Sequence, residues 1–566
     1  MPGLVQSGHV PADAHMEQSA FCLLGDDMST SKSIFIDDCQ GNMKTLRSRV
    51  AAALHVADPN SLTFHDASGE QLETFDEIAH AQGSIGCLID GQEVRSPSGP
   101  QGLPLFGSFY EIFPDHLGNH ARLFTKYGNV IKTTNMGKTT YLTNDPYIAA
   151  IAFAESPFFT KNITPDHPLF GVKDNTALFV GDTETENWRL SHRFIPPAMS
   201  PKAVRHYTPS MQQCVRSSFK VFDELDRTGT AFNAYQFMLK LASQTIGKFA
   251  LDMDLRHFES VDSPLHPLVK SIATLLSLNK KVVARGDWYR HLPFGDPARL
   301  KEARRQSYSI VQDCVDAVKS GGSDLPMDEA ALKATCVVDY LVRAIDKEGK
   351  KLPEHLILAN MVIVSGAGFT TTSALLSWLL YALVTYPGNQ ERLLQELVDH
   401  GISNDIDWSP DLPNKLPFLD NFIKETQRLH NPSFQPGRTT KTEVVLPGGY
   451  RLPPNAVIVP ALYALHSNPE HWRDPQRFDP DRWDTEQVKN RHRYSYIPFA
   501  AGPRGCIGFN FALQETKVLL AELVYRYEFV KDDLEAVEYD PEFQLVRPLN
   551  LYVSCRKRTS WPQKSE

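Results

Sequence analysis

The chain has 566 residues, of which 42% are hydrophobic and 22% are charged, and its formal net charge is -9. This composition excludes a disordered protein, and the lack of a basic block argues against nucleic acid as a partner. Eight cysteines occur singly without a CxxC pair, which argues against a disulfide framework and a zinc site and indicates a reducing compartment.

The first segment, residues 1–18, is polar and acidic and is predicted to be a disordered tail. It lacks the basic flank and apolar run of a signal peptide, and it lacks a membrane anchor. We therefore expect a cytoplasmic protein without a transmembrane anchor. Any membrane contact is expected to be peripheral, on the cytosolic face of the endoplasmic reticulum.

Residues 19–95 are predicted to form a small α+β module. The pattern is strand, strand, helix, strand, strand, at residues 20–24, 33–36, 45–55, 62–64 and 86–89. This order resembles a ubiquitin-like β-grasp module, and a decorated extension of the main domain fits the same pattern.

A run of Pro, Gly and Ser occupies residues 96–104 and is typical of a linker. We place the domain boundary there, so the main domain is predicted to be residues 105–566.

Helical patterns dominate the main domain. Trp188 and His192 are four residues apart on a predicted helix and share one face, and Phe179 precedes Trp188 by nine residues. The spacing of these side chains is equally typical of ordinary packing.

Residues 356–390 carry no charge and are long enough to span a bilayer. Their interior, Ser365-Gly-Ala-Gly-Phe-Thr-Thr-Thr-Ser373, is too polar for lipid, so we predict a helix buried in a large protein. The glycines weaken this helix, and the threonine hydroxyls can bond back to the preceding turn, which favours a local bend.

Four charged residues of the next segment are singled out by their spacing. Glu425 and Arg428 lie three residues apart on one helix face, where the arginine fork can bind the carboxylate through both nitrogens. Arg438 follows ten residues after Arg428, and Arg482 lies further along. A Glu–Arg pair at this spacing is common by chance, so its position relative to other motifs decides its value.

A single cysteine, Cys506, lies in the glycine-rich loop Phe499-Ala-Ala-Gly-Pro-Arg-Gly-Cys-Ile-Gly508, just before a predicted helix at 509–527. The positive end of the helix dipole favours a thiolate, which suits Cys506 to bind iron. Glycines allow a flat macrocycle to approach closely, Phe499 can shield the sulfur, and Arg504 offers a cation to a propionate. A structural cysteine in a surface loop is the alternative.

This loop resembles the signature loop of cytochrome P-450 enzymes, and Cys506 matches the position that ligates the haem iron. The resemblance covers about residues 105–557. It implies the mainly α P-450 fold with a small β region and haem b (iron protoporphyrin IX) as cofactor. The spacing of Phe179 is nearest to the fatty-acid-hydroxylase branch.

The resemblance also implies roles for the other motifs. Trp188, His192 and Arg438 match propionate-binding residues, and Phe179 matches an aromatic residue that projects over the haem. Glu425, Arg428 and Arg482 match a buried structural triad behind the haem. Ala367, Thr370 and Thr371 match the oxygen-activation motif and the wall of the substrate pocket.

The chain departs from the family at Thr370, where an acid is expected, whereas Thr371 matches the expected alcohol. A hydroxyl can relay protons but does not store them near pH 7, which puts ordinary monooxygenation in doubt.

The leading hypothesis is a haem-thiolate monooxygenase. It would hydroxylate or epoxidise an apolar small molecule with dioxygen, in secondary or lipid metabolism. About 60 residues follow Cys506, too few for a flavin or nicotinamide domain, so NADPH would act through a separate flavoprotein reductase. A haem-thiolate isomerase, dehydratase or peroxygenase is the alternative enzyme, and a haem sensor or scaffold is the non-enzymatic alternative.

Overall fold

The computed structural model describes residues 18–170, 173, 175–285, 288–319, 322–403, 406–433, 436–531, 533, 535–541, 543 and 545–565. The predicted tail, residues 1–18, lies outside these residues apart from Gln18, where the first strand begins. The chain divides into two compact units, Met1–Pro97 with Thr440–Asn455, and Ser98–Thr439 with Ala456–Glu566.

The smaller unit is a five-stranded sheet with helices and a hairpin. Its elements are β1 (Gln18–Leu23), β2 (Lys32–Phe35), α1 (Met43–Ala53), β3 (Leu62–His65), β4 (Gln71–Leu72), α2 (Phe75–Ala79), β5 (Ser84–Ile89) and the hairpin strands β13 (Val444–Leu446) and β14 (Tyr450–Leu452). The sheet order is β2-β1-β5-β3-β4, with β1 and β5 parallel and the other neighbours antiparallel. The predicted strand, strand, helix, strand, strand order is present in β1, β2, α1, β3 and β5, whereas the likeness to a ubiquitin-like β-grasp module stays a prediction.

Helix α1 begins two residues before its predicted start. The cause is Asn42, whose side chain accepts hydrogen bonds from the backbone N–H groups of Lys44 and Thr45, at 2.9 and 3.2 Å. Leu46 and Val50, on the predicted apolar face, are fully buried in the core of the unit.

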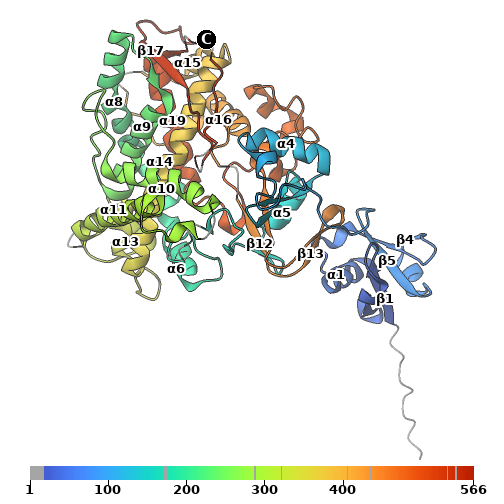
Figure 1. The fold of residues 1–566 in the computed structure, drawn as a ribbon. Helices are drawn as coiled ribbons and strands as arrows, with labels where there is room; N and C mark the ends of the chain where they lie inside the picture. The colour runs from blue at the N-terminus through green and yellow to red at the C-terminus, as the bar shows by residue number, and fades with distance from the viewer. Residues whose placement is uncertain are drawn as a thin grey trace, which may run out of the picture. The chain divides into compact units, whose positions relative to one another are not determined.

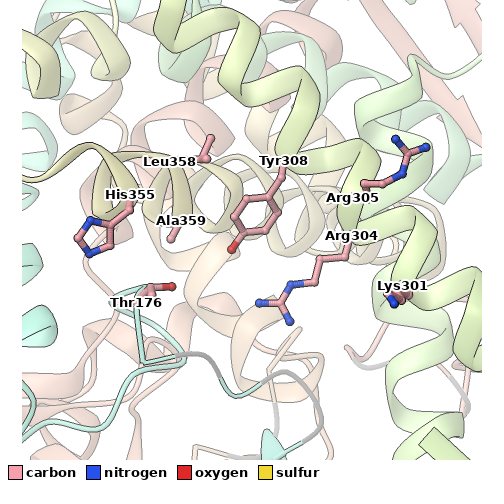
Figure 2. A pocket seen from close by; sticks show the side chains of 8 residues that line it. All are labelled: Thr176, Lys301, Arg304, Arg305, Tyr308, His355, Leu358 and Ala359. Atoms are coloured by element: carbon pink, nitrogen blue, oxygen red, sulfur yellow. The ribbon is translucent and has the colours of Figure 1, made fainter. Parts of the chain in front are cut away.

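The larger unit is mainly helical (Figure 1). Its longer helices are α4 (His116–Tyr127), α5 (Pro146–Phe153), α6 (Glu186–Phe194), α8 (Thr208–Thr228), α9 (Ala234–Leu251), α10 (Pro267–Ala284), α11 (Gly295–Val318), α14 (Glu354–Thr385), α15 (Asn389–Asp399), α16 (Pro417–Leu429) and α19 (Phe509–Arg526). A mixed sheet of order β6-β7-β15-β12-β8 contains β6 (Val130–Asn135), β7 (Lys138–Thr143), β8 (Phe159–Thr160), β12 (Arg438–Thr440) and β15 (Val457–Pro460). A smaller sheet joins β16 (Tyr527–Val530), β17 (Tyr552–Lys557) and β9 (Phe232–Asn233).

Helix α14 is the central element of this unit, with α9 and α19 packed beside it (Figure 1). In the described part of the chain it is the one helix long and apolar enough to cross a membrane. Most of its apolar window is buried, as in the core helix of a folded domain. Packing against α9 explains the glycine at position 368, because a Cβ there would lie 2.6 Å from the side chain of Ile246.

Candidate functional site

The loop before α19 presents Cys506. The backbone N–H of Cys506 donates to the carbonyl of Phe499 at 2.9 Å, which closes the loop. Gly502 has a φ of 71°, and a Cβ there would lie 2.2 Å from the carbonyl oxygen of Phe153 on α5. Close contact with α5 therefore requires this glycine, whereas a Cβ on Gly508 would meet nothing within 4 Å. The loop leaves space at Gly508.

The Cys506 thiol is exposed to solvent. Burial nevertheless raises its pKa, and the backbone N–H of Gly508 opposes that shift. Cys506 therefore combines accessible surface, which leaves it open to a ligand, with many protein atoms around its sulfur.

Three cations lie close to this loop, on separate segments; Lys161 and Arg438 are buried and Arg504 is half-buried. The Arg504 guanidinium donates to the carbonyl oxygens of Leu178 and Phe179, at 3.0 and 3.2 Å. Lys161, next to strand β8, donates to the same Phe179 carbonyl at 2.7 Å. Arg438, at the start of β12, donates to the carbonyl of Ala501 at 3.4 Å.

Their charges are only partly compensated, by the nearby carboxylates of Glu155 and Asp182. Burial lowers the pKa of Arg438 to about 10. Burial and the neighbouring Arg438 lower that of Arg504 to about 9. Burial, Arg504 and Arg438 place the pKa of Lys161 well below its usual range. Among the described residues, no carboxylate forms an ion pair with any of the three. A buried cluster of like charges is costly unless an anion joins it.

Helix α6 adds two aromatic side chains to the cation cluster. Thr185 caps the helix by accepting from the backbone N–H of Trp188 at 3.3 Å. The Trp188 and His192 rings stack at 4.5 Å, and Arg504 lies 5.0 Å from the Trp188 ring centre. The buried indole N–H of Trp188 has no hydrogen-bond partner among the described residues. It therefore remains available to an acceptor.

Helix α14 presents a small side chain and two threonines. Ala367 is exposed although Gly366 and Phe369 beside it are buried, so it faces open space. Thr371 lies one turn further on the same face and donates to the carbonyl of Ala367 at 2.9 Å. Thr370 is 2% exposed and donates to the carbonyl of Gly366 at 2.8 Å. The two hydroxyls thus differ in access.

Phe179 lies on the segment before α6, with 49% of its surface exposed. Its carbonyl accepts hydrogen bonds from Arg504 and Lys161, so its backbone is held at the cation cluster. The ring centre lies 4.5 Å from the Lys161 ammonium. Phe499 is half-buried, and its ring centre lies 6.3 Å from that of Phe509.

Glu425, Arg428 and Arg482 form a buried ionic triad. Arg428 donates to both Glu425 carboxylate oxygens, at 3.0 and 2.9 Å, and Arg482 donates to one of them at 2.9 Å. Arg428 and Glu425 are completely buried. The Trp483 indole and the backbone N–H of Asp479 complete the hydrogen bonds to Glu425. Every group of the triad is paired, as a structural role requires.

Comparisons with known proteins agree with this geometry. A model of the family "Cytochrome P450" matches residues 97–555. The chain is 51% identical to the cytochrome P450 monooxygenase alnD of Emericella nidulans, over 97% of this chain and 100% of that protein. The chain belongs to the cytochrome P450 family. It is also 30% identical to cytochrome P450 4F3 of Mus musculus, over 67% of this chain and 75% of that protein.

A crystal structure of the cytochrome P450DA heme domain has the same fold, with a TM-score of 0.72 and 22% identity. The matched region covers 82% of this chain and 98% of the chain in that crystal structure. Haem b is the cofactor of this P450, and electrons from a reductase are typical of the family. The described residues fit haem, because an accessible cysteine lies in the same loop as Arg504, one of three only partly compensated cations that suit two propionates.

Two buried ionisable residues of the larger unit, Lys161 at the cation cluster and Glu515 on α19, were not predicted from the sequence. Lys161 looks like an ordinary surface lysine, and its 6% exposure is a tertiary property. Glu515 on α19 is fully buried, and burial raises its pKa well above its usual range, an effect that the hydroxyls of Thr372 and Thr245 oppose. A polar residue within an apolar helical pattern was the one available signal for Glu515.

Proposed function

We propose that this P450 inserts one atom of dioxygen into an apolar small organic molecule, by hydroxylation or epoxidation. The electrons come from NADPH through a separate flavoprotein reductase. The observation that supports this most is the exposed Cys506 thiol in one loop with Arg504, together with the accessible Ala367 and Thr371 on the central helix. The name of the alnD relative, a cytochrome P450 monooxygenase, supports the monooxygenase activity, and we place that activity in secondary or lipid metabolism as part of the proposal.

In this proposal Cys506 ligates the haem iron, while Arg504, Arg438, Trp188 and His192 hold the propionates. Bound haem supplies the redox-active iron that dioxygen-dependent oxidation needs. Phe499 shields the sulfur, and Phe179 and Ala367 border the substrate. Thr371 positions a proton at its hydroxyl, on the face of α14 that Ala367 shares.

The experiment is a reconstitution with reductase, NADPH and isotopically labelled dioxygen. A screen of apolar ligands that shift the haem absorption band chooses the substrate candidates. We expect substrate-dependent NADPH oxidation and one labelled oxygen atom in the product. Product without label, or turnover without NADPH, would overturn the proposal.

A second candidate is a haem-thiolate isomerase, dehydratase or peroxygenase. Thr370 favours it, because a buried hydroxyl bonded to the Gly366 carbonyl replaces the usual acid. Such an enzyme needs no proton delivery from this helix. It would turn over its substrate, or substrate with peroxide, without reductase.

We further propose that the protein is cytosolic and touches membranes peripherally. Trp288 and Phe294 are 69% and 65% exposed, and the basic residue Arg290 lies between them. Exposed aromatic side chains beside cations suit the headgroup region of an anionic bilayer. Co-sedimentation with anionic vesicles that Trp288→Ser weakens would support this contact, and equal sedimentation of both proteins would contradict it.

A further inference from the structure

The hairpin of β13 and β14 connects strands β12 and β15 of the larger sheet, but its residues belong to the smaller unit. It leaves β12 after Thr440 and returns to β15 at Val457, and the backbone N–H of Asn455 donates to the Thr440 carbonyl at its base. Strands β12 and β15 pair through Arg438 with Ile458 and Thr439 with Val457. Strand β12 therefore joins the hairpin to Arg438 within seven residues of Val445.

Both edges of the hairpin are hydrogen-bonded by the N-terminal module. On β13, the N–H of Val445 donates to the His55 carbonyl and its carbonyl accepts from the Ala57 N–H, each at 2.9 Å. On the other side, the Arg95 N–H donates to the Gly449 carbonyl and the Arg451 N–H donates to the Arg95 carbonyl, each at 2.9 Å. The module thus pairs the strand edges that a two-stranded hairpin would leave open.

Side chains strengthen this association. Val445 is fully buried and belongs to the module core. Asp26 and Arg451 form a two-pronged, partly buried ion pair, with one contact of 2.7 Å. Gly449 has a φ of 78°, and a Cβ there would lie 2.5 Å from the Glu93 carbonyl oxygen. The contact is close, apolar at its centre and ionic at its side.

We propose that the N-terminal module is the intramolecular partner of this hairpin, and that by holding the hairpin it positions Arg438 for haem retention. Asp26 and Arg451 are the positioning residues. The inference rests on the role proposed for Arg438 as a propionate ligand. It gives the module a function within its own chain.

The physical basis is the cost of leaving strand edges and a valine exposed. An isolated hairpin is marginally stable in water, so β13 and β14 need the module to persist. A disordered hairpin would release one end of β12 and β15, since both strands continue directly into it. Arg438 begins this three-residue strand, two residues before the released end at Thr440, so the position of its buried guanidinium depends on the pairing of β12 with β15.

The test uses the full-length, haem-loaded protein and a double-mutant cycle on Asp26→Asn and Arg451→Gln. We expect each single variant to lose haem to apomyoglobin about three- to tenfold faster, because the pair is partly exposed and should contribute about as much as an ordinary hydrogen bond, about 0.7–1.4 kcal/mol. The double variant should be no faster than the faster single one, because both remove the same contact. Asp38→Asn is the matched control, since its pair with Arg49 is an exposed one in the same module.

A second readout separates positioning from general destabilisation. Arg438→Met should lower the midpoint potential of the haem, and Gly449→Ala should shift it in the same direction. Ile78→Val, a conservative change on α2 in the module core, should leave the potential unchanged. Gly69→Ala is the backbone control, because its φ is 90° and a Cβ there meets nothing within 4 Å.

Two results would overturn distinct claims. If Arg438→Met leaves haem loss and potential unchanged, the role of Arg438 fails. If Arg438→Met changes both while the Asp26, Arg451 and Gly449 variants match wild type, the module does not position Arg438.

Discussion

Replacing Glu425 by glutamine should show that the buried triad holds the larger unit together. The Glu425 carboxylate accepts hydrogen bonds from Arg428, Arg482, Trp483 and the backbone of Asp479. The amide of Glu425→Gln keeps the shape but not the charge, and it turns one acceptor into a donor. Two buried guanidinium groups are then left without a neutralising partner. Breaking such a pair costs about 3–5 kcal/mol.

The size of the larger unit converts this energy into a temperature. It has about 450 residues, and unfolding entropy near 60 °C is about 2.1 cal/mol/K per residue, or about 1 kcal/mol/K in total. A loss of about 4 kcal/mol should therefore lower Tm by about 4 °C. Circular dichroism of the haem-loaded variant and wild type, scanned at one rate, measures the shift.

The control is Asp481→Asn, which breaks an exposed pair with Arg392 in the same region. An exposed pair contributes at most about 1 kcal/mol, so its Tm should change by about 1 °C or less. Equal Tm values for Glu425→Gln and Asp481→Asn would refute the reasoning, because burial of the charges would then make no difference. Turnover per haem should stay close to wild type in both variants, since the triad is structural.

Two further changes address the cofactor site. Cys506→Ala should lose the absorption band of a thiolate-ligated, reduced carbon-monoxide complex, and an unchanged band would contradict ligation by Cys506. Lys161→Met should raise the stability of the haem-free protein at pH 7, because it removes a buried charge, and should speed haem loss from the loaded protein. A variant that stabilises both the haem-free and the haem-loaded protein, or destabilises both, would contradict this argument. Burial holds the pKa of Lys161 in the folded state below its unfolded value of about 10.5. The buried positive charge therefore destabilises the fold at low pH, and this destabilisation is relieved as the lysine loses its proton at higher pH. The stability of the apo wild type should thus rise with pH, and that of Lys161→Met should not.

Local sequence patterns predicted the fold well where the determining contacts are local. The apolar spacing of Leu46 and Val50 predicted α1, and the cap at Asn42 explains its shifted start. Strand β4 has two residues and helix α2 has five, too short for a periodic signal. The place of the hairpin in the module was not visible, because Asp26 and Arg451 are 425 residues apart in sequence.

The same distinction applies to the site. Cys506 and the Glu425–Arg428 pair carry short spacings that can be recognised along the chain. Lys161 and Glu515 do not, because burial of a charged side chain depends on packing between distant segments. Gly502 was predicted to make room for a macrocycle, whereas its contact with the Phe153 carbonyl shows that backbone packing alone requires it.

Thr370→Ala and Thr371→Ala are a matched pair of variants that tests proton delivery, because each removes one hydroxyl group and the two residues are adjacent on α14. Thr371 shares a face with the exposed Ala367, whereas Thr370 is 2% exposed and bonded to Gly366. Thr371→Ala should therefore lower the ratio of product formed to NADPH consumed, with more hydrogen peroxide released. Thr370→Ala should leave that ratio near wild type.

The effect at Thr371 should be modest, because general acid catalysis contributes about a hundred- to ten-thousandfold at most and water can replace part of it. Thr370→Asp restores the acid of the family pattern and should raise the ratio, since a buried carboxyl has a raised pKa and keeps its proton to donate. Equal ratios in wild type and all three variants, with NADPH still required, would remove both threonines from proton delivery. Turnover that needs no NADPH would instead favour the isomerase, dehydratase or peroxygenase, because that chemistry draws no protons from α14.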